Sequence, residues 1–181
     1  RDRGQAVQVL AAVEDSDGIA SVELLYQIVE PGSYISIGDP EYQTEWTRQV
    51  MNPAGAMSQA GQVYEAVIPA SVQVHRRLVR YRIVATSESG DSITVPYADD
   101  PQPNFAYFVY DGVPNWQGAI RPQRPGSVEG TPVDFDFSAM RPTAVYHLIT
   151  KDEDYDDGLR SSGYEGSDYP WHGALVYGDH V

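Results

Sequence analysis

The chain of 181 residues contains no cysteine. This absence excludes disulfide bonds, zinc sites built on cysteine thiolates and thiol-based catalysis. No apolar run approaches the roughly 18 residues that a membrane-spanning helix needs. The sequence also lacks a signal-peptide pattern and an initial methionine. We therefore expect a piece of a longer protein, and no membrane span within this piece.

Basic residues are few: 12 lysines and arginines stand against 26 aspartates and glutamates, which gives a net charge of −14. A nucleic-acid or anionic-membrane partner needs a basic face, because phosphate groups are negative. The one basic cluster, "HRR" at 75–77, is too short to reverse the overall field. We expect no nucleic-acid partner. An acidic surface is compatible with cation binding and with an extracellular setting.

Familiar enzyme signatures are missing as well. The sequence has no G-x-S-x-G nucleophile elbow, no Walker loop and no G-x-G-x-x-G fingerprint. We assign no catalytic and no cofactor-binding residue to this chain.

The first part of the chain has the period-two alternation of half-buried strands. In the strand expected at 78–86, for example, Val79, Tyr81 and Ile83 point one way and the arginines between them the other. Strands separated by turn signals, without helical periodicity, predict a mainly β fold, an antiparallel β-sandwich. We expect strands at 5–13, 19–29, 45–51, 63–69, 78–86, 92–96 and 104–110, and loops at 30–44 and 52–61.

Three stretches, "VEDSDGIASVELLYQI", "YEAVIPA" and "VRYRIVATSESGD", give this part a family resemblance. It resembles the Ig-like/fibronectin-III-like modules of large exported bacterial proteins. The resemblance covers roughly residues 4–110 and implies an Ig-like sandwich domain at 1–111. It implies an exported, extracellular or cell-surface protein, but no activity, because fold does not fix function.

The remainder of the chain divides in two. Residues 112–140 are rich in proline and glycine and predict a linker, in which "VDFDFS" pairs as a short strand. Residues 141–181 predict the truncated start of a second domain. We expect a strand at 144–150, an acidic loop or short helix, and then a hairpin that turns at Gly178 and Asp179 and is cut at Val181.

This second part carries its own resemblance. "PTAVYHLIT", an acidic stretch and "ALVYGDHV" resemble the start of the spore-coat-H-type (CotH) kinase domain. The resemblance implies that the parent protein is an atypical protein kinase using ATP and a divalent metal. The family's catalytic residues lie far downstream of these strands, so none falls here. The implied role of this chain is a non-catalytic accessory or interaction module, whose partners are neighbouring domains or a protein or cell-surface partner.

Two acidic groups are candidate calcium ligands. Asp152, Asp154 and Asp156 alternate as in a calcium loop, although the sixth position is an aspartate rather than glycine and the twelfth is not glutamate. The alternative is a solvated acidic connection. Asp15 and Asp17 are a second candidate pair, and their alternative role is to cap a tight turn.

Aromatic residues provide one more candidate surface. Tyr34, Tyr42 and Trp46 are candidates for a sugar-stacking surface, with core packing as their alternative role, and Trp46 is expected to fill the core. The chain's alternative function is therefore a calcium- or carbohydrate-binding adhesion module. A third possible function is that of the accessory half of an extracellular hydrolase.

Overall fold

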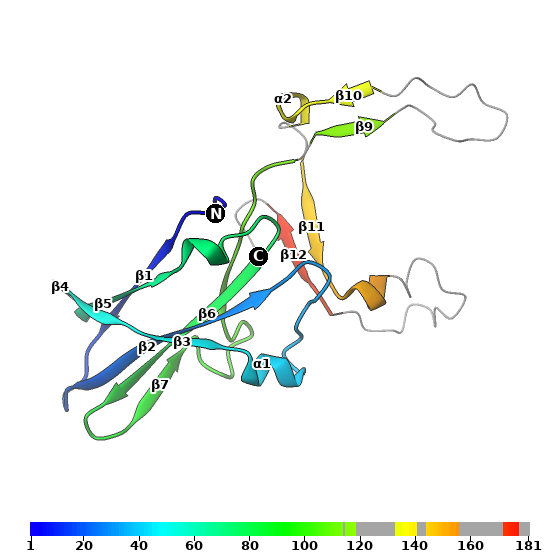
Figure 1. The fold of residues 1–181 in the computed structure, drawn as a ribbon. Coiled ribbons are helices and arrows are strands. Elements are labelled where there is room, and N and C mark those ends of the chain that lie inside the picture. Colours follow the sequence, from blue (N-terminus) through cyan, green and yellow to red (C-terminus); the bar gives the residue numbers. More distant parts are fainter. Residues whose placement is uncertain (114, 119–132, 141–143, 156–171, 178–181) are drawn as a thin grey trace.

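The computed structural model describes the chain except for residues 114, 119–132, 141–143, 156–171 and 178–181 (Figure 1). The first eight strands are β1 (Val7–Val13), β2 (Ile19–Val29), β3 (Thr47–Val50), β4 (Asn52–Ser58), β5 (Gly61–Ile68), β6 (Leu78–Ser87), β7 (Ser92–Val95) and β8 (Phe105–Phe108). Two short helices accompany them: α1 (Pro40–Thr44) and the 3-10 helix η1 (Ala70–Val72). The later elements are β9 (Trp116–Gly118), β10 (Val133–Phe135), α2 (Phe137–Met140), β11 (Tyr146–Ile149) and β12 (Ala174–Tyr177).

The first eight strands form two antiparallel sheets. One sheet has the order β1-β5-β4, and the other has the order β3-β2-β6-β7, with β8 also paired to β6. The chain crosses from the second sheet to the first at Met51, whose N–H donates to the carbonyl of Val22 at 2.8 Å. The predicted mainly β, antiparallel sandwich is confirmed.

The main core lies between the two sheets. Its buried residues come from alternate positions, such as Val22 and Leu24 of β2, Ala66 and Ile68 of β5, and Val79 of β6. The inward direction predicted for Val79, Tyr81 and Ile83 of β6 is confirmed, because all three belong to this cluster or pack against it. Burial of the side chains of Leu24, Ile68 and Val79 contributes roughly 1.5–3 kcal/mol each.

The opposite face of the second sheet is buried too. Gln27 and Val29 of β2 and Leu78 and Arg80 of β6 alternate with the core positions, yet none is more than 5% exposed. The segment at 30–46 and the β11–β12 pair cover this face. Both faces of the second sheet are therefore covered by other parts of the chain. The candidate site lies on the outer of these two faces.

Three local expectations were wrong. Residues 52–61 were expected to form a loop, but 52–58 form the edge strand β4, which tolerates Pro53 because it pairs with β5 on one side only. The segment expected as a loop at 30–44 contains helix α1. Trp46, expected in the core, precedes β3 and is half-buried outside the core cluster.

In the predicted linker, β9 and β10 form an antiparallel pair that Figure 1 shows projecting away from the two sheets. The rings of Trp116 and Phe135 stack across it, with centroids 5.4 Å apart. The expected strand in "VDFDFS" is confirmed as β10.

The predicted strands in the last part are also confirmed, as β11 and β12, which pair antiparallel with each other. The Gly178–Asp179 turn lies outside the described residues. In the part of the chain that the structure describes, no helix is long and apolar enough to cross a membrane.

Candidate functional site

The β11–β12 pair packs on the outer face of the second sheet. Val29, Leu78 and Phe108 of the sandwich form one buried cluster with Ile149 of β11 and Val176 of β12. Ile149 is 6% exposed and Val176 is 4% exposed. We call this contact the junction. Figure 1 shows β11 and β12 beside the sandwich, separate from β9 and β10.

Backbone geometry fixes the segment that borders the junction. Gly32 has a φ of +78°, a left-handed conformation that glycine adopts without a steric cost. Its carbonyl accepts the N–H of Asp152 at 2.9 Å. A Cβ on Gly32 would lie 2.4 Å from a carboxylate oxygen of Asp152. A side chain at position 32 would therefore strain the left-handed backbone and displace the carboxylate of Asp152.

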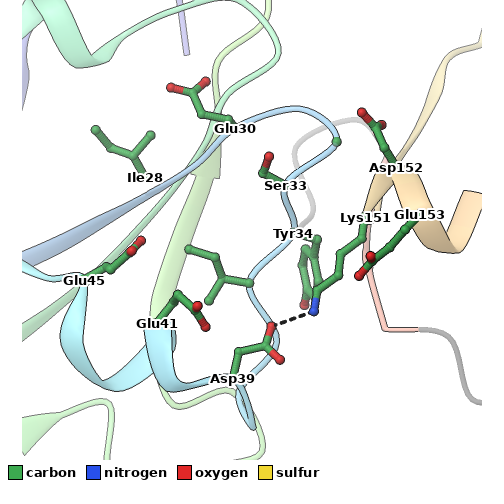
Figure 2. Close-up of a pocket in the computed structure, with 12 residues that line it drawn as sticks. Ile28, Glu30, Ser33, Tyr34, Asp39, Glu41, Glu45, Lys151, Asp152 and Glu153 are labelled. Atoms are coloured by element: carbon green, nitrogen blue, oxygen red, sulfur yellow. Dashed lines mark ion pairs between the residues drawn. The ribbon is translucent and has the colours of Figure 1, made fainter.

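An ion pair crosses the junction nearby. Lys151 Nζ lies 3.2 Å from Asp39 Oδ2, and the same oxygen accepts the N–H of Ser36 at 2.7 Å (Figure 2). The Ser36 N–H, and to a lesser extent Lys151, lower the pKa of Asp39 below its ordinary value. The hydrogen bond to Asp39 raises the pKa of Lys151. Both groups are therefore charged at neutral pH.

A buried arginine holds the 30–46 segment on the sheet. Arg80 is 5% exposed and donates to the carbonyl of Ile35 at 2.7 Å. Its guanidinium lies 4.9 Å from the ring centroid of Tyr34 and 5.7 Å from that of Tyr42. Cation–π contacts of this kind contribute roughly 0.5–2 kcal/mol. Tyr42 is buried in turn, and its hydroxyl bonds to Asn104 at 2.9 Å.

Between the segment and the chain after β11 lies a pocket of about 540 Å³ (Figure 2). Its lining combines apolar residues with acidic ones, and Lys151 is the one basic residue among the described residues that line it. Its acidic residues are Glu30, Asp39, Glu41, Glu45, Asp152 and Glu153. Glu30 forms an ion pair with Arg77, and Asp39 with Lys151. The pocket therefore keeps a negative potential that attracts cations.

Two of the three calcium ligands predicted after β11 lie among the described residues. Asp152 and Asp154 lie in a helical turn at 152–155, and Asp156 falls outside the described residues. Acids in the first turn of a helix interact favourably with its N-terminal end. Over the described residues, no three acidic or histidine side chains come close enough to hold a metal ion. Calcium binding by this group stays a prediction.

The other predicted acidic pair forms a turn. Oδ1 of Asp15 accepts the N–H of Asp17 at 2.8 Å, and Gly18 follows with a φ of +88°. This is the Asx-turn arrangement expected if the two aspartates cap a turn.

The three aromatic residues expected as a sugar-stacking surface surround arginines. Tyr34 and Tyr42 face Arg80, and the ring of Trp46 has the Arg82 guanidinium 4.0 Å from its centroid. One face of each ring is therefore occupied by a guanidinium. Burial raises the pKa of Tyr42.

Sequence reasoning missed the residues that build the junction. A signal was present for β2, because "LLYQIV" is apolar at nearly every position, a pattern typical of strands buried on both faces. No comparable signal marked Asp39 and Lys151, because ion pairs between distant segments leave no trace in one sequence.

No family model matches the chain, and no curated protein matches it significantly.

Proposed function

We propose that the sandwich is a non-catalytic support that holds the start of a following domain against its outer face, in a larger exported bacterial protein. The observation that supports this proposal is the two-sided apolar character of the β11–β12 pair. One face contributes Ile149 and Val176 to the junction. An isolated two-stranded ribbon is marginal in water, and the sandwich supplies the missing apolar surface.

The other face of the pair is apolar and uncovered. Leu148 and Leu175 stand opposite each other and are 67% and 58% exposed. Tyr146 and Tyr177 stack with their centroids 4.4 Å apart. Strands with apolar side chains on both faces are typical of a sheet covered on both sides. The proposal assigns this second face to the body of the following domain.

The resemblance to the CotH-type kinase start gives that domain a candidate identity. On this proposal the parent is an atypical kinase that binds ATP and a divalent metal in its following domain. The sandwich, with its Ig-like pattern, contributes position and no chemistry.

The test introduces a charge into the junction. Ile149→Asp buries a carboxylate among the apolar side chains of Val29, Leu78 and Phe108, which is unfavourable because these side chains offer it no hydrogen-bond donor. We expect hydrogen exchange of the β11 and β12 amides to accelerate by at least tenfold, while the β2 and β6 amides stay protected.

Leu148→Asp is the matched control, because it places the same charge one residue away on the exposed face. It should leave the exchange of the β12 amides within about twofold of the wild type. Equal effects of the two variants would reject docking through Ile149. Loss of protection in β11 on adding a calcium chelator to the wild-type chain would instead favour a calcium-binding module.

A further inference from the structure

A histidine sits inside the junction. His147 of β11 lies on the same face as Ile149 and is paired across the ribbon with Val176. Its ring centroid is 4.7 Å from that of Phe108 and 4.5 Å from that of Tyr110, the latter in an edge-on arrangement. The imidazole therefore packs against two aromatic rings of the sandwich, where a neutral ring fits better than a charged one.

The two titratable groups that act on His147 are basic. Arg76 and His75, from the turn before β6, are the two that act on it. His75 stacks on the other side of the cluster, 5.4 Å from the Tyr110 centroid. The Arg76 backbone is held at a φ of +68°, and its N–H donates to the carbonyl of Val109 at 2.8 Å. This anchoring keeps the Arg76 guanidinium beside the junction.

Two acids that follow junction residues in the chain, Asp111 and Glu30, are engaged elsewhere. The carboxylate of Asp111 accepts the N–H of Arg3 at 3.2 Å and lies 3.9 Å from its guanidinium. Glu30 is bound by Arg77. From β12, the residue opposite His147 is the uncharged Val176. In the described part of the chain, no carboxylate therefore forms an ion pair with a protonated His147.

We propose that His147 makes the junction pH-sensitive: it docks the β11–β12 pair as a neutral imidazole and weakens that docking when it takes up a proton in mildly acidic solution. The inference rests on the proposed docking function, whose regulation it describes. Its ligand is the proton alone, and the element that responds is the β11–β12 pair.

Burial first, and then Arg76 and His75, lower the pKa of His147 in the docked state. The undocked imidazole has an ordinary pKa of about 6.5. The undocked state therefore binds more protons below about pH 6.5. Above that pH the docked state keeps its full stability. Between pH 7.5 and 5.5 the equilibrium constant for docking falls by up to about tenfold.

The experiment compares hydrogen exchange at pH 7.5 and 5.5, corrected for the intrinsic pH dependence of exchange, in the wild type, His147→Phe and His172→Phe. His147→Phe keeps an aromatic ring in the junction but cannot gain a proton. His172 is the matched control, because it is exposed and lies just before β12. We expect β11 and β12 protection to fall by between about two- and tenfold at pH 5.5 in the wild type and His172→Phe, and to stay constant in His147→Phe.

Several outcomes overturn the inference. A change under twofold in the wild type, or an equal loss in His147→Phe, removes His147 as the sensor while leaving docking intact. Absence of protection in the wild type at both pH values instead rejects the proposed function itself. If His147→Phe does not dock, NMR titration of the wild-type imidazole decides, because a pKa at or above about 6.5 contradicts the inference.

Discussion

At the scale of single residues, Gly32 is a point of close contact between the sandwich and the segment after β11. Its φ of +78° alone disfavours a side chain, and the carboxylate of Asp152 occupies the space that a Cβ would need. The backbone strain is therefore the main cost of a substitution here, because the exposed Asp152 side chain can turn away.

Gly32→Ala should destabilise the chain by about 1–2 kcal/mol, mainly from the left-handed backbone. It should also break the hydrogen bond from the Asp152 N–H to the Gly32 carbonyl. Urea denaturation and exchange of the Asp152 amide measure the two effects. Gly38→Ala is the control, because no described atom lies within 4 Å of the place that its Cβ would take and its φ is not left-handed. Similar losses in the two variants would contradict this account of Gly32.

For single residues of β6, the sequence predicted the direction of the side chains but not their burial. The inward side chains of β6 followed from alternation alone, and so did the outward direction of Arg80. Its burial between Tyr34 and Tyr42 did not follow, because burial on that face depends on where the 30–46 segment folds back. A charged side chain on the outward face of a strand is ordinarily expected to be exposed to solvent.

At the scale of elements, the Asp39–Lys151 pair connects the start of α1 to the end of β11. Because both side chains are only half-buried, the ion pair contributes at most about 1 kcal/mol to the free energy of unfolding. Because the pKa of Asp39 is lowered in the folded state, its contribution is present above the ordinary carboxyl pKa of about 3.8 and is lost as pH falls through the lowered value.

Asp39→Asn should therefore cost about 1 kcal/mol of unfolding free energy at pH 6, and this cost should shrink as the pH is lowered toward 3. Urea denaturation at several pH values measures it. Glu41→Gln removes a charge from the same helix and should change the unfolding free energy by less than about 0.5 kcal/mol at each pH. A cost for Asp39→Asn that is constant or rises toward acid pH would refute the assigned role.

The strands β1, β2 and β6 were predictable because apolar and polar residues alternate strongly along them. Strand β4 was missed because "NPAG" contains the residues that mark turns, and its strand conformation depends on its pairing with β5. The β11 and β12 strands were predicted separately. Their pairing with each other was not, because a sequence pattern does not specify partners across a long separation.

At the scale of the whole molecule, the second sheet carries two buried faces. Its inner face closes the sandwich core, and its outer face carries the 30–46 segment and the β11–β12 pair. The division into a sandwich at 1–111, a linker at 112–140 and the start of a second domain at 141–181 remains a prediction. The packing shows that the last part contacts the first, whatever the domain boundary.

The exposed face of the β11–β12 pair is apolar. Its leucines and tyrosines give the molecule an uncovered apolar surface beside a strongly acidic remainder. Contiguous apolar surface of this kind marks an interaction site more often than a free surface. In the proposed account, the following domain covers it while the sandwich holds the opposite face.

The central claim is that the β11–β12 pair docks on the sandwich through Ile149. The most direct measurement is a methyl nuclear Overhauser spectrum of the full 181-residue chain at pH 7.5. The account predicts cross-peaks from the Ile149 methyls to the methyls of Leu78 and Val29 and to the ring of Phe108. Ile149 methyl shifts at random-coil values without these cross-peaks, in a chain whose β2–β6 contacts are intact, would contradict it.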